Sequence, residues 1–148
     1  MVWFCEAENG EQVIAQHGVL APLFDNFYAS FYQQAHIPPV VLELCRLRVA
    51  QLHKNAAEFR LQLCDVEFGQ RDALVNWPSS EVFSEAQRSC LALAEVYSMD
   101  VHAISDAHTN AVKQHYGDAG LVALIQALGV FYGLTRMGQV WGVEGAAP

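Results

Sequence analysis

Residues 43–62 read Glu43-Leu-Cys-Arg-Leu-Arg-Val-Ala-Gln-Leu-His-Lys-Asn-Ala-Ala-Glu-Phe-Arg-Leu-Gln62. Polar and charged side chains interrupt a framework of Leu, Val, Ala and Phe in this stretch. A buried polar or charged group costs several kcal/mol unless it is paired, so the stretch either lies on the surface or lines a site. Its polar members include Glu43, Arg46, Arg48, Gln51, His53, Asn55, Glu58 and Gln62.

Two helices are predicted within and before this stretch, separated by a break at His53. The first begins near Pro39, because proline suits the first turn of a helix, and its apolar residues occupy two faces, which is typical of a largely buried helix. After the break, Asn55-Ala-Ala-Glu58 has the form of a capping box, with a short polar side chain at the N-cap and Glu three residues later. The capping box predicts a second helix over about 56–69.

The remainder of the chain continues the helical pattern. Aromatic and aliphatic residues recur at helical spacing after Pro22 and stop before the two prolines that follow Ile37. No stretch of useful length alternates at a period of two, so we expect an all-α fold of about six helices in a single domain, residues 1–148, with its core over about 22–143. The expected helices cover about 22–32, 39–52, 56–69, 84–97, 105–117 and 118–143.

Composition sets limits on partners. The chain is 53% hydrophobic and 16% charged, with a net charge of −8. The low charged fraction predicts extra surface buried between subunits, as in a homo-oligomer. The negative charge argues against nucleic acid or an anionic membrane as a partner.

The sequence also bears on the compartment. The first residues contain no basic segment and no long apolar run, so no signal peptide is expected and the protein is predicted to be cytoplasmic. Residues 121–143 are the one membrane-like stretch, but Gln126, Arg136 and Gln139 interrupt it. We therefore expect a buried helix there, not a membrane span.

The cysteines form no CxxC pair. They are widely spaced, which predicts reduced thiols in a cytoplasmic protein, each most simply a small buried apolar side chain. They are Cys5, Cys45, Cys64 and Cys90.

Three segments in order carry a resemblance. They are Glu43-Leu-Cys-Arg-Leu-Arg-Val-Ala-Gln-Leu-His53, Phe83-Ser-Glu-Ala-Gln-Arg-Ser-Cys-Leu-Ala-Leu-Ala-Glu95 and Leu121-Val-Ala-Leu-Ile-Gln-Ala-Leu-Gly129. Together they resemble the carboxymuconolactone decarboxylase and alkylhydroperoxidase D-like family, over roughly residues 22–143. The resemblance implies an all-α alkylhydroperoxidase D-like bundle that assembles as a dimer, trimer or hexamer.

The resemblance also implies where a redox site would lie. Peroxidase members of the family use a Glu, a CxxC twelve residues later and a His four residues after the second Cys. The Glu falls at Glu43, but the other three positions hold Asn55, Glu58 and Gln62. Peroxide reduction needs a thiolate and a resolving thiol, and an amide cannot relay a proton as His does. We therefore predict a protein that is not a peroxidase and binds a small ligand near Glu43 and Glu58, with no cofactor.

Other readings of the same residues stay open. Asn55 and Glu58 can simply cap a helix. Alternatively, Glu43 and Glu58 can act as an acid and base with His53 nearby, in lactone hydrolysis or decarboxylation, because two carboxyls in an apolar pocket can have separated pKa values. A third reading is a peroxiredoxin-type antioxidant that uses Cys45 or Cys64 instead.

The remaining polar residues are assigned as follows. Arg46 and Arg48 are expected to pair with Glu43, Glu58 or Asp65. Candidate ligand-binding side chains are Asn55, Gln62 and Arg48. The spacing of His53, Glu43 and Glu58 is too irregular to favour a metal, so none is expected.

Substitutions can test the missing redox residues. The double change Asn55→Cys with Glu58→Cys is expected not to restore peroxidase activity, because the proton relay is still missing at Gln62. Adding Gln62→His is then expected to raise turnover, if Glu43 occupies the relay position.

Overall fold

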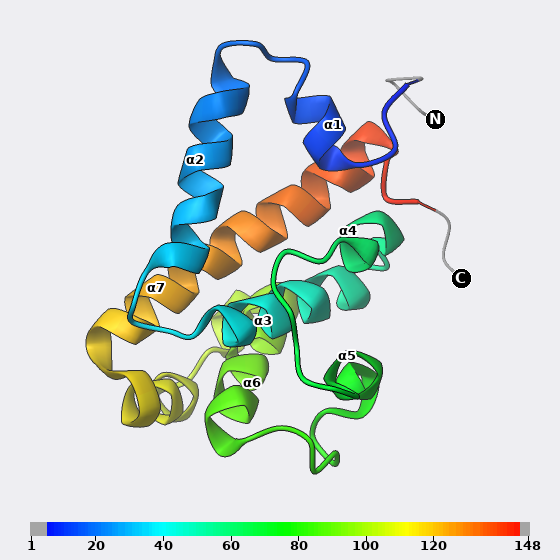
Figure 1. Ribbon diagram of the computed structural model, residues 1–148. Helices are drawn as coiled ribbons and strands as arrows, with labels where there is room; N and C mark the ends of the chain where they lie inside the picture. The colour runs from blue at the N-terminus through cyan, green and yellow to red at the C-terminus, as the bar shows by residue number, and fades with distance from the viewer. Residues whose placement is uncertain (1–5, 146–148) are drawn as a thin grey trace.

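The structure, a computed structural model, describes residues 6–145, and that range is all-helical with no strand (Figure 1). This confirms the predicted all-α class. Seven α-helices and two 3-10 turns follow one another in the described range: α1 Gly10–Ile14, α2 Leu20–Gln33, α3 Pro39–Leu52, α4 Ala56–Arg60, α5 Gln70–Ala73, η1 Leu74–Asn76, α6 Glu85–Met99, η2 Val101–Ala103 and α7 Asp106–Trp141.

Helix α3 forms the centre of the core. It packs against α6 and α7. Helix α2 packs against α3 and α7 from another side (Figure 1). Nine of the fourteen α3 residues are buried, as its two apolar faces predict, including the charged side chains of Glu43 and Arg46. A buried helix that carries charges must pair them internally, and this requirement defines the candidate site described below.

Several predicted helix starts and ends are confirmed. Helix α3 begins at Pro39 and ends at Leu52, followed by the break at His53. The side chain of Ser84 caps α6 in a reciprocal capping box, and Ser105 is the N-cap residue of α7, where its amide donates to His108 Nδ1 at 3.1 Å.

Gly117 interrupts α7, close to the predicted boundary between two helices. Its φ of 66° and ψ of −173° are non-helical. That combination lies in a region of backbone conformation that is almost exclusive to glycine. The expected pair of helices is therefore present as two arms of α7 that meet at this kink.

Helix α7 is long and apolar enough, by length and composition alone, to cross a membrane. One face of it, however, lies in the core: Leu124, Ala127, Leu128 and Phe131 are all buried against the rest of the domain. The core helix of a globular domain can have the same length and composition.

The prediction for α4 was wrong at its C-terminal end. The helix was expected to run to about residue 69, but it ends at Arg60, and Leu61 is extended with a ψ of 142°. In a longer helix the carbonyl of Glu58 would accept from the amide of residue 62. Here that carbonyl accepts instead from Arg46 Nη1 at 2.6 Å, so a side chain of α3 replaces the helical hydrogen bond.

Candidate functional site

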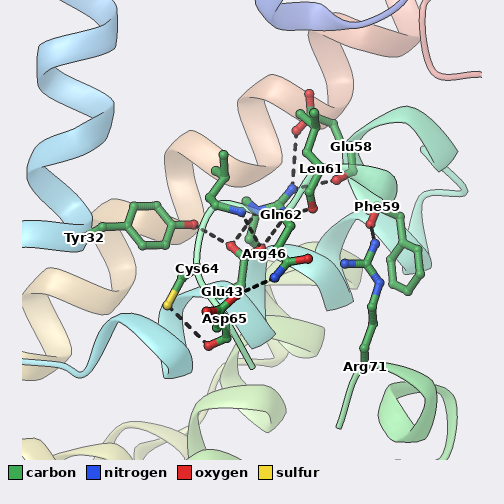
Figure 2. Close-up of polar contacts among 11 residues, drawn as sticks. Tyr32, Glu43, Arg46, Glu58, Phe59, Leu61, Gln62, Cys64, Asp65 and Arg71 are labelled. Carbon is green, nitrogen blue, oxygen red and sulfur yellow. Dashed lines mark hydrogen bonds and ion pairs between the residues drawn. The ribbon is translucent and has the colours of Figure 1, made fainter. Parts of the chain in front are cut away.

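The candidate site is arranged around a buried ion pair on α3 (Figure 2). Arg46 donates from Nε to Glu43 Oε2 at 2.9 Å and from Nη2 to Glu43 Oε1 at 2.7 Å. The two residues are three apart on the helix, so their side chains lie one above the other. Their exposed fractions are 0% for Glu43 and 2% for Arg46, so each charge depends on the other for its compensation.

The same pair fixes the segment that follows α4. Arg46 donates to the carbonyls of Glu58 and Leu61, both at 2.6 Å, while Glu43 Oε1 accepts from the Leu63 amide at 3.2 Å. The hydroxyl of Tyr32, on α2, donates to Glu43 Oε2 at 3.0 Å. Helices α2, α3 and α4 thus meet at one buried polar cluster (Figure 2).

Asn55 caps α4, as predicted. Its Oδ1 accepts from the Glu58 amide at 3.0 Å, and its Nδ2 donates to the Thr135 carbonyl of α7 at 3.3 Å. Gly138 makes room for this approach, because a Cβ there would lie 2.9 Å from Asn55 Nδ2. The second half of the expected capping box is absent, since the Asn55 amide donates to the Ala50 carbonyl instead of to Glu58.

The Glu58 carboxylate is therefore available for other contacts. It lies 3.6 Å from Arg46 Nη1 and is almost fully buried. Burial raises the pKa of Glu58 above its usual range. The charge of Arg46 lowers this pKa by a smaller amount, and the charges of Glu11 and Glu43 raise it slightly. A carboxyl of this kind can exchange a proton closer to neutral pH than an exposed one.

Glu58 forms part of the wall of a cavity of about 350 Å³ between α1, α2, α4 and α7. Most of the lining is apolar or aromatic, which suits a small organic molecule. Tyr28 also lines the cavity, but its hydroxyl oxygen is closed off from water and makes no hydrogen bond of ordinary geometry in the described part of the chain. The lining residues are Glu11, Ile14, Phe24, Asp25, Tyr28, Ala29, Tyr32, Gln33, Glu58, Leu61, Leu63 and Leu134.

Arg48 lies apart from this cavity. It donates from Nε to Glu95 Oε1 of α6 at 2.7 Å, and the same oxygen accepts from Trp77 Nε1 at 2.8 Å. The expectation that Arg48 pairs with Glu43, Glu58 or Asp65 was wrong, whereas Arg46 does pair with the first two. Two residues along a helix turn the side chain to another face, so the two arginines serve different neighbours.

His53 is also outside the cavity wall. Its ring contacts Tyr132 edge-on with 5.3 Å between centroids, and its carbonyl accepts from Gln139. Burial, and then the charge of Arg136, lower the pKa of His53 below its usual range. The structure does not place His53 beside Glu43 and Glu58 in the cavity.

Gln62 is exposed and hydrogen-bonds to Asp65 at 2.6 Å, not to Glu43 or Glu58 (Figure 2). The early end of α4 is the cause, because the chain leaves the helical path before residue 62.

Arg71 holds the neighbouring segment in place. It donates to the Phe59 carbonyl and lies over the Phe59 ring, 4.6 Å from the ring centroid.

The thiols that the structure describes are free, and none of them is activated. Burial raises the pKa of Cys45 and sets that of Cys90 at about 12. Cys64 is partly buried, and burial with the charges of Glu43 and Asp65 raises its pKa too. A raised pKa leaves less thiolate, which is the reactive form. Cys5 lies outside the described residues.

Potential metal ligands do not gather in the described residues: no group of three or more His, Cys, Asp or Glu side chains there could hold an ion. Sequence reasoning placed Tyr28 and Tyr32 on a helix but did not connect them with a site, and it did not consider Glu11. Their positions depend on how α1 and α2 pack, for which the local sequence holds no signal.

Comparison with models of known protein families finds no match to this chain, and comparison with curated protein sequences finds none either.

Proposed function

We propose that the protein is a redox-inactive relative of the alkylhydroperoxidase D-like family that binds a small, largely apolar ligand in the cavity beside Glu58. The observation that carries the proposal is a mostly apolar cavity of about 350 Å³ with the Glu58 carboxylate in its wall. A pocket of this kind binds a small molecule through its apolar surface, while a few polar groups fix the orientation of the ligand.

Two observations speak for binding over the alternative chemistries. Arg46 holds both oxygens of Glu43, so Glu43 is poorly placed to act with Glu58 as an acid and base pair. The raised thiol pKa values of Cys45 and Cys64 argue against an antioxidant that relies on either.

Fragment binding tests the proposal directly. We expect single-ring aromatic fragments to give saturation-transfer NMR signals with the wild type and to lose them with Ala29→Trp, which places an indole in the cavity mouth. Asn26→Trp is the matched control, because Asn26 is also exposed on α2 but does not line the cavity. No fragment binding to the wild type, or equal binding by both variants, would overturn the proposal.

Peroxide turnover provides a second test. We expect none from the wild type, and none from Asn55→Cys with Glu58→Cys. In contrast to the expectation from sequence, we also expect none when Gln62→His is added, because residue 62 is exposed beside Asp65 and Glu43 is held by Arg46. The assay is peroxide consumption with a dithiol reductant. Substantial turnover by the wild type would contradict the redox-inactive assignment. Turnover by the triple variant alone would contradict the argument that a histidine at position 62 cannot relay a proton with Glu43.

Self-association is proposed as part of the same function. Large apolar side chains are exposed on α2, with Leu23 at 62% and Phe27 at 53%, and again on α7, with Val122 at 56%. Exposed apolar surface of this extent is typical of an interface between subunits. We expect light scattering to give a multiple of 16.4 kDa, and Leu23→Glu with Phe27→Glu to give the monomer mass. A wild-type mass near 16.4 kDa at micromolar concentration would contradict this prediction.

A further inference from the structure

The cavity wall is acidic and carries no basic side chain. Three carboxylates, Glu11, Asp25 and Glu58, line it together with apolar and aromatic residues. Such a wall gives the cavity a negative potential, which repels anions and attracts cations. A ligand with a carboxylate is therefore disfavoured on charge alone.

Arg46, the basic group that pairs with Glu58, is not available to a ligand. Its Nε and Nη2 donate to Glu43, its Nη2 also donates to the Leu61 carbonyl, and its Nη1 donates to the Glu58 carbonyl. Its charge is balanced by Glu43 within the protein, and it is not part of the cavity wall. Recruiting it to an anion would leave Glu43 buried without a partner.

The polar groups of the cavity wall suit a ligand that donates hydrogen bonds. The Tyr28 hydroxyl oxygen is closed off from water, so the charged acceptors of the wall are its carboxylates. The Glu58 carboxylate offers only a 3.6 Å ion pair to Arg46, longer than a hydrogen bond. The ring of Tyr28 stacks on Phe24 at 5.8 Å between centroids, so aromatic faces that can hold a cation lie on the same wall.

Resting on the proposed function, we infer that the cavity selects a small hydrophobic amine, whose ammonium group donates to the Glu58 carboxylate while its apolar part packs against the apolar and aromatic wall. The charge of the wall, the Glu58 acceptor and the aromatic faces all favour this class over acids and neutral molecules of equal size.

A pH dependence follows from the position of Glu58. Burial raises its pKa, so part of its population is neutral at mildly acidic pH, and an ammonium group beside it favours the ionised form. Amine binding therefore releases a proton and tightens as the pH rises through the pKa of Glu58. The titratable and charged groups around Glu58 are Glu11 from α1, Asp25, Tyr28 and Tyr32 from α2, and Glu43 and Arg46 from α3.

Three probes of nearly equal shape test the inference: 2-phenylethylamine, 2-phenylethanol and phenylacetate, each titrated into the full-length protein by calorimetry. We expect the amine to bind at least about tenfold more tightly than the alcohol, a difference of about 1.4 kcal/mol, and phenylacetate to bind weakest. Equal or tighter binding of the alcohol or the acid overturns the amine assignment and leaves the ligand cavity intact. Binding of none of the three overturns this inference, and fragment binding to the wild type then decides the proposed function separately.

Single substitutions test which carboxylates make the amine bind more tightly than the alcohol. Glu58→Gln is expected to remove the advantage of the amine over the alcohol and its proton release, and Glu11→Gln, at an exposed part of the wall, to reduce the advantage by a smaller factor. Glu81→Gln makes the same change in net charge at an exposed site away from the cavity and is expected to leave all three affinities unchanged. An advantage that survives both Glu58→Gln and Glu11→Gln would overturn the assignment.

Discussion

Replacing Arg46 by methionine is expected to lower the free energy of unfolding by about 3–5 kcal/mol, because it leaves a buried carboxylate without its counter-charge. Glu43 is fully buried, and two of its hydrogen bonds come from Arg46. The substitution also strips the carbonyls of Glu58 and Leu61 of their donors. Urea denaturation followed by circular dichroism measures the loss.

Arg48→Met is the matched control, since it removes the same side chain two residues further along α3. The Arg48–Glu95 pair is partly exposed, at 13% and 29% of the two side chains, so water can replace the lost partner. We expect this variant to lose markedly less stability than Arg46→Met. Adding Glu43→Leu to Arg46→Met should recover part of the loss by removing the stranded charge. Equal losses for both single variants would contradict the buried-pair account.

The parts of the fold that sequence predicted are those that local chemistry decides. Within a helix, proline fits only the first turn, and α3 begins at Pro39. Ser84 and Ser105 are the N-cap residues of α6 and α7, and Gly117 adopts a backbone conformation that other residues avoid. Each of these signals acts within a few residues of its own position. They sufficed for an all-α chain with most helix boundaries in the right place.

The end of α4 could not be predicted in the same way, because a distant residue decides it. Nothing in the sequence from residue 56 to 69 forbids a helix. The helix ends because Arg46, twelve residues before Glu58, takes over its carbonyl, and Glu43 takes the Leu63 amide. This tertiary competition moved Gln62 out of the site to which the spacing had assigned it.

The candidate site was predicted in part for a related reason. Glu43 and Glu58 were both expected beside one cavity; both contact Arg46, but only Glu58 lines the cavity. Most of the rest of the wall comes from α1, α2 and α7, including Tyr28. A periodic aromatic stripe predicts burial of such a residue, but not that it lines a cavity together with Glu58.

Phe131→Ala is expected to cost about 3–5 kcal/mol, because it empties a large volume at the point where α7 meets α2. Phe131 is 1% exposed and packs edge-on against Tyr28, with ring centroids 6.1 Å apart, and at a tilt against Tyr32, at 6.3 Å. Both tyrosines line the cavity, so the same change should also weaken fragment binding. Urea denaturation measures the first effect and saturation-transfer NMR the second.

Two controls separate packing volume from aromatic contact and from residue type. Phe131→Leu fills most of the space and loses only the aromatic pairs, so we expect it to cost about 1–2 kcal/mol. Phe68 is fully exposed, at 102%, and Phe68→Ala should change stability by no more than about 0.5 kcal/mol. If Phe131→Ala costs no more than Phe131→Leu, then Phe131 does not fill the core between α2 and α7, and the positions of Tyr28 and Tyr32 do not depend on it.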